Sequence, residues 1–155
     1  MDGFDEIRPE TGERLLIGAL RRMVLALDPY GVVTRRMSEA FGEDAAEVTA
    51  TTRTFLQAMA YAGRRRLAVG HPGSIVLTRD EEQLIGLIAA AQAANPAWLE
   101  AHLRWLAKPD CRVPLAIAAR ALGTALAVHG YRFVAPLPAR PDLTVARPEI
   151  AARFR

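Results

Sequence analysis

Five arginines surround one predicted turn and are the residues of this chain best suited to binding phosphate. Arg64, Arg65 and Arg66 are consecutive, Arg53 lies one helix face earlier, and Arg79 follows the turn. Guanidinium groups can donate paired hydrogen bonds to phosphate oxygens, so these five are the candidate nucleic-acid contacts. The same run is also typical of a solvated helix C-terminus, where cations complement the helix dipole.

A second candidate site combines aromatic rings with a histidine. Trp98, His102 and Trp105 are separated by four and three residues, which places them on one face of a predicted helix. This face could bind a protein partner. The spacing is equally that of a helix face buried in a core, where tryptophan contributes a large apolar area.

The inventory for catalysis and metal binding is small. The chain has three histidines and one cysteine, Cys111, and no two of them have a metal-ligand spacing on one helix. Its two serines, Ser38 and Ser74, do not lie in a nucleophile motif. Paired acids such as Glu81-Glu82 fall at predicted helix starts, where the helix dipole favours them. We therefore predict no catalytic, cofactor or metal site and no enzyme activity.

Helices must position most of these residues. Apolar residues recur with helical spacing in several segments, which are separated by Gly, Pro and Asn signals. Asp44 with Glu47, and Thr78 with Glu81, have the spacing of a capping box. Arg14, Arg21 and Arg22 fall off the apolar stripe of the first helix. The predicted helices span residues 11–27, 32–41, 45–62, 80–94, 97–107 and 114–129.

Between the third and fourth predicted helices the apolar pattern becomes short and extended. Residues 67–69 and 75–77 are two apolar runs around a turn-rich stretch, 70–74, which predicts an antiparallel β-hairpin. The order of elements over residues 11–94 resembles the layout of winged-helix regulators. The resemblance is carried by Ala62-Gly63-Arg64-Arg65-Arg66 before the hairpin and Leu77-Thr78-Arg79-Asp80-Glu81 after it. It implies nucleic-acid binding through the basic corner and the hairpin.

The distribution of acidic residues argues against that function. Glu43, Asp44 and Glu47 stand at the start of the third predicted helix, where a recognition helix would approach phosphates. The formal net charge is +3, but residues 1–80 hold 11 basic and 11 acidic residues. The basic excess therefore lies outside the hairpin half, and Lys108 is the only lysine.

Composition also bears on the compartment. A single cysteine excludes an internal disulfide framework. The first 14 residues are charged and carry no apolar segment typical of a secretory signal. No uninterrupted apolar run approaches the roughly 20 residues that span a bilayer. These patterns predict a cytoplasmic protein that is not integral to a membrane.

Together, these patterns predict an all-α fold of five or six helices with one small two-stranded β-hairpin and a winged-helix-like N-terminal half. Residues 1–134 are expected to form one domain, with the hairpin near 67–77, and residues 135–155, rich in proline, a strap or a disordered tail. We expect a non-enzymatic regulatory or adaptor protein that acts through a helical protein-binding surface, including pairing with a second copy of itself. The alternative is a winged-helix-like nucleic-acid-binding regulator.

Overall fold

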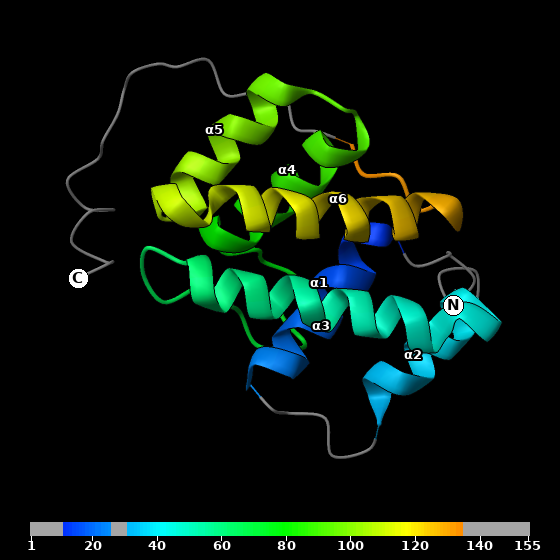
Figure 1. The fold of residues 1–155 in the computed structure, drawn as a ribbon. Helices are drawn as coiled ribbons and strands as arrows, with labels where there is room; N and C mark the ends of the chain where they lie inside the picture. Colours follow the sequence, from blue (N-terminus) through cyan, green and yellow to red (C-terminus); the bar gives the residue numbers. More distant parts are fainter. Residues whose placement is uncertain (1–10, 26–30, 135–155) are drawn as a thin grey trace.

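The computed structural model describes residues 11–25 and 31–134, which form six α-helices and two 3₁₀ turns (Figure 1). The end of the first predicted helix, most of the turn after it and the predicted C-terminal strap or tail at 135–155 lie outside the described residues. The elements are α1 (Gly12–Leu25), α2 (Val32–Phe41), η2 (Gly42–Asp44), α3 (Ala45–Ala62), α4 (Arg79–Gln92), α5 (Pro96–Leu106), η3 (Pro109–Cys111) and α6 (Arg112–Val128).

Helix α4 lies at the centre of the described fold. Every residue from Leu84 to Ala90 is buried, as expected for a helix that is apolar on all sides. It packs against α5 and α6, while α3 packs along α6, α2 against α3, and α1 against α2. In Figure 1, α3 and α6 lie side by side across the front of the molecule.

The start of α4 confirms the capping box predicted from the sequence. The Glu81 amide donates to the Thr78 hydroxyl at 3.1 Å, and the Thr78 amide donates to the Glu81 carboxylate at 2.9 Å. At the start of α5, the Asn95 side chain accepts a hydrogen bond from the Trp98 amide. Local side-chain contacts thus fix where these two helices begin.

The capping role predicted for Asp44 at the start of α3 is wrong. Asp44 precedes the first residue of α3, but its side chain makes no capping hydrogen bond. Its carboxylate lies 3.2 Å from His129 Nε2, just after α6 ends. The contact joins the N-terminal end of α3 to the C-terminal end of α6.

The predicted β-hairpin at 67–77 is also wrong, and the winged-helix-like layout fails with it. The α3–α4 loop (residues 63–78) contains no strand, and the isolated bridge found in the described residues joins Gly63 to Ala107. Side chains bind backbone groups in both the predicted strands and the predicted turn. Asp80 accepts from the Ala68 amide, Glu81 accepts from the Gly70 amide, and Arg21 donates to the carbonyls of His71, Ser74 and Val76.

Candidate functional site

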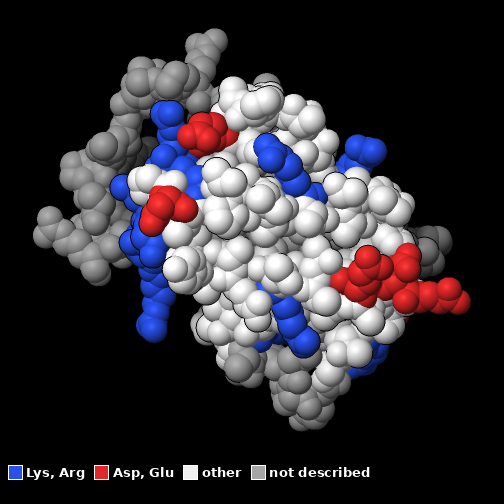
Figure 2. Space-filling model, in the orientation of Figure 1, with Lys and Arg blue, Asp and Glu red and all other residues white. Residues whose placement is uncertain are grey.

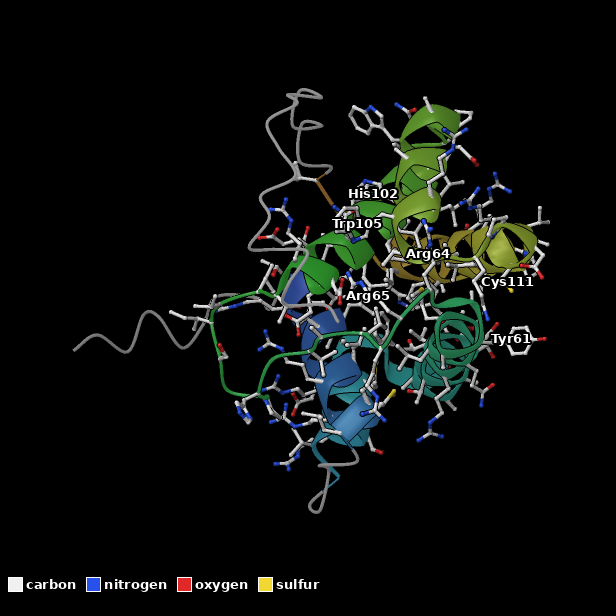
Figure 3. All side chains as sticks on the ribbon, turned by 90° about the vertical axis from the view of Figure 1, so that its left-hand side faces the viewer. Tyr61, Arg64, Arg65, His102, Trp105 and Cys111 are labelled. Atoms are coloured by element: carbon white, nitrogen blue, oxygen red, sulfur yellow. The ribbon has the colours of Figure 1, made fainter. Side chains whose placement is uncertain are left out.

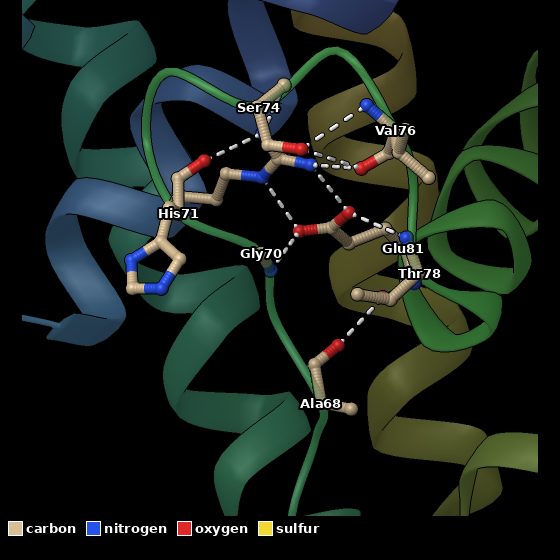
Figure 4. A network of polar contacts seen from close by, with 8 residues as sticks. Ala68, Gly70, His71, Ser74, Val76, Thr78 and Glu81 are labelled. Carbon is tan, nitrogen blue, oxygen red and sulfur yellow. Dashed lines mark hydrogen bonds and ion pairs between the residues drawn. The ribbon is translucent and has the colours of Figure 1, made fainter.

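A buried ion pair holds the α3–α4 loop against α1 (Figure 4). The Arg21 guanidinium donates to both carboxylate oxygens of Glu81, at 2.7 and 2.8 Å. The two residues are only 2% and 0% exposed. The sequence placed Arg21 off the buried stripe of its helix and Glu81 among ordinary helix-start acids, so it missed this pair.

The electrostatics of this pair indicate a structural role. Burial alone would raise the pKa of Glu81, but hydrogen bonds from Arg21, Gly70 and Thr78 outweigh it and lower that pKa. The hydrogen bond to Glu81 raises the pKa of Arg21. Each Glu81 oxygen accepts two hydrogen bonds, so the carboxylate stays ionised and fully engaged.

Arg65, one of the five candidate nucleic-acid contacts, forms a second ion pair. Its guanidinium makes two hydrogen bonds with Asp80, at 2.7 and 2.8 Å, and Asp80 is buried. The same carboxylate accepts the Ala68 amide at 2.7 Å. Arg65 therefore fastens the beginning of the loop to the first turn of α4.

The other four arginines of that set are exposed but do not all lie together. Arg64 donates to the carbonyl oxygen of Arg104 in α5 at 3.1 Å. Arg66 lies in the loop, and Arg79 is the first residue of α4. Arg53 lies nine residues before Ala62, where α3 ends, which corresponds to about 14 Å along the helix.

The aromatic and histidine residues of α5 have different environments. Trp98 is half-buried and packs against the core, whereas Trp105 is 41% exposed. His102 is half-buried, and its Nδ1 lies 2.7 Å from Gln83 Oε1 on α4. Its ring lies so close to Gly86 that a Cβ there would approach it to 2.4 Å. Burial lowers the pKa of His102. These contacts make His102 part of the α4–α5 packing.

One end of the molecule brings together members of both predicted sites (Figure 3). The Gly63–Ala107 bridge joins the end of α3 to the end of α5, and the Lys108 amide donates to the Ala62 carbonyl at 2.9 Å. Arg64 and Trp105 lie at this end, as does Tyr61, which is 78% exposed. Lys108 Nζ lies 5.6 Å from the centre of the Tyr61 ring. We call this the basic end.

An open cleft of about 490 Å³ lies between α1, α2 and the α3–α4 loop. Arg14 and Arg36 contribute to its wall, and Ile75 and Leu77 line it from the loop. The cleft includes none of the residues selected from the sequence as candidate contacts.

A broad apolar surface runs along α3 and α6, and we call it the α3–α6 face. Contacts of Asp44 with His129 and of Ala62 with Lys108 show that the two helices run antiparallel. The inner side of α6 is buried, yet Val113, Ile117 and Val128 on its outer side are 70%, 61% and 76% exposed. The exposed residues of the face are mostly uncharged, and they are Thr54, Tyr61, Val113, Ile117, Ala121, Thr124 and Val128, with Arg120 between Ile117 and Thr124 on α6.

Figure 2 shows this face in the orientation of Figure 1. White, uncharged side chains cover most of its middle, with basic side chains above and below. Acidic side chains gather at its right-hand end, and its left-hand edge carries mostly basic side chains with some acidic ones among them. Among the described residues, the helical stretch 109–128 is long and apolar enough to cross a membrane by length and composition alone. A core helix of a soluble protein has the same properties.

Comparison with protein-family models, with curated proteins and with solved structures gave no match. Among the described residues, no group of three or more His, Cys, Asp and Glu side chains could hold a metal ion.

Proposed function

We propose that this protein is a non-enzymatic regulatory or adaptor module that pairs with a second copy of itself through the α3–α6 face. The observation that supports this is the two-sided apolar character of α6. Arg112 and Arg120 are the only charged residues in this 17-residue helix. A helix that is apolar on both sides is usually covered on both.

The size of the face suits a modest interface. Helix α3, with 18 residues, is about 27 Å long, and two adjacent helices are roughly 20 Å wide. The projected area is then roughly 540 Å², close to the roughly 600 Å² per partner at the lower end of stable interfaces. Burying the exposed Val and Ile side chains favours association, because full burial of each contributes about 1.5–3 kcal/mol of free energy before the costs of association are subtracted.

The test is the oligomeric state of two matched variants. Ile117→Glu places a carboxylate in the middle of the α3–α6 face. Ile75→Glu makes the same change at a side chain that is 88% exposed on the α3–α4 loop, away from the face. We expect sedimentation at 10–200 μM, about the range in which modest dimers form, to show dimers for the wild type and Ile75→Glu and monomers for Ile117→Glu.

Circular dichroism distinguishes loss of pairing from loss of folding, since all three proteins should keep the same helical signal. A wild-type protein that is monomeric throughout this range contradicts the proposal. Equal association of Ile117→Glu and the wild type contradicts the assignment to this face.

A further inference from the structure

The two ends of the α3–α6 face carry opposite charges. Glu43, Asp44 and Glu47 are exposed at the end where α3 begins. We call this the acidic end. His129, after the last turn of α6, is the basic group in contact with it, through Asp44. Arg132 is exposed and lines a cavity with Gln92 and Gly123 and with two residues of the face, Thr124 and Val128, so it offsets part of this negative charge.

At the other end of the face the balance is reversed. Arg64 and Lys108 are exposed, and Arg112 is half-buried, with its Nε donating to the Ala107 carbonyl. Asp110 in η3 is the exposed acid nearest to them in sequence. Arg104 is paired with Glu100 at 3.2 Å, so this couple adds little net charge. The basic end therefore keeps a positive excess.

We infer that two copies pair antiparallel, so that the acidic end of each lies on the basic end of the other. This inference rests on the proposed self-association. A two-fold axis that lies in the plane of the interface, perpendicular to the helices, exchanges the two ends of the face and therefore creates the favourable charge contact twice. A parallel arrangement would place acid against acid and base against base.

The middle of the face is built to lie on such an axis. Thr54 is midway between Glu47 and Tyr61 on α3, and Ala121 is close to the midpoint between Val113 and Val128 on α6. Thr54 and Ala121 are small and exposed, which permits close approach of helices from the two copies, whereas Arg120, exposed beside Ala121, has to turn away from the axis. Larger exposed apolar side chains flank this centre on α6.

Disulfide cross-linking tests the orientation in the full-length protein. Thr54→Cys places a thiol near the expected axis, whereas Glu47→Cys and Tyr61→Cys place thiols toward the acidic and basic ends. Under mild oxidation, we expect Thr54→Cys to form covalent dimers by itself. Glu47→Cys and Tyr61→Cys should each stay uncross-linked alone and form a covalent dimer when mixed.

The wild type is the control, because its single cysteine, Cys111, is buried. Cross-linking of Glu47→Cys with itself would show a parallel pair and overturn the inference. The inference is also overturned if no cross-link forms while the wild type is dimeric and Ile117→Glu is monomeric. In that case, self-association through this face would still stand, but not its antiparallel orientation. A monomeric wild type overturns both proposals.

Discussion

Removal of the Glu81 carboxylate is expected to be the most damaging change to a polar side chain in the described fold. Glu81→Ala leaves the Arg21 guanidinium, 2% exposed, without its counter-ion. Breaking a buried pair in this way costs about 3–5 kcal/mol. The variant also loses the carboxylate that accepts the Gly70 and Thr78 amides. We therefore expect a loss of about 4 kcal/mol, a large part of a typical folding free energy of about 5–15 kcal/mol.

Urea denaturation measures this loss directly. With a slope near 2 kcal/mol per molar urea, the midpoint should fall by about 2 M. The matched control is Glu82→Ala, which removes an exposed carboxylate from the same helical turn and should change stability by less than about 1 kcal/mol. Amide exchange gives a local readout, because the Gly70 and Thr78 amides should exchange faster in Glu81→Ala alone.

The double variant Arg21→Met with Glu81→Met tests whether the unpaired charge causes the loss. Replacing both members of a buried pair by apolar residues is often far less costly than removing one. The double variant should therefore be more stable than the sum of the two single changes predicts. A Glu81→Ala protein within 1 kcal/mol of the wild type, or strict additivity in the double variant, would refute this reasoning.

The same pair predicts a dependence of stability on acid. The pKa of Glu81 is lowered in the folded protein from its ordinary value of 4.5, so the unfolded chain binds this proton first. Its stabilisation is complete above pH 4.5 and is lost as the pH falls through the lower folded pKa. The free energy of unfolding of Glu81→Ala should therefore vary less over this acidic range than that of the wild type.

Two further predictions concern residues selected from the sequence. We expect no sequence-specific DNA complex near physiological salt. The double variant Arg64→Ala with Arg66→Ala, which keeps the structural Arg65, should leave retention on DNA unchanged. A fall of about 1.8 in the slope of log affinity against log salt would instead show that these arginines contact phosphates. Burial lowers the pKa of His102 below 6.5, so the free energy of unfolding should fall as the pH drops from about 7 toward 5. The variant His102→Gln should show a weaker dependence on pH over this range. Equal pH profiles for the wild type and the variant would contradict this prediction.

The helices could be predicted from the sequence because their signals are local. Apolar periodicity located the helical segments, and the spacing of Thr78 and Glu81 identified a capping box that the structure contains. The predicted and observed helix ends differ by a few residues. Helix α6, for example, begins at Arg112, two residues before the Pro114 that marks its first turn.

The loop could not be predicted in the same way, because its structure depends on a distant residue. Short apolar runs around a glycine-rich turn are typical of a hairpin. Here Arg21, 60 residues before Glu81, supplies the donors for three loop carbonyls. No local pattern distinguishes this arginine from Arg22, its half-buried neighbour. The ion pair satisfies the loop backbone without a second strand, so the tertiary contact overrides the local preference.

The candidate interaction surface was only partly visible in the sequence, for a related reason. The abundance of alanine and the scarcity of charge in α6 are local properties of the sequence, and small side chains permit close helix packing. The separation of acidic and basic charge between the two ends of the face depends on tertiary structure. One end combines the start of α3 with the end of α6, and the other combines the end of α3 with the segment that precedes α6. Glu43, Asp44 and Glu47 entered the sequence argument as groups that repel phosphate. In the fold, the same three acids lie at one end of an apolar face whose other end is basic, the arrangement that an antiparallel second copy would complement.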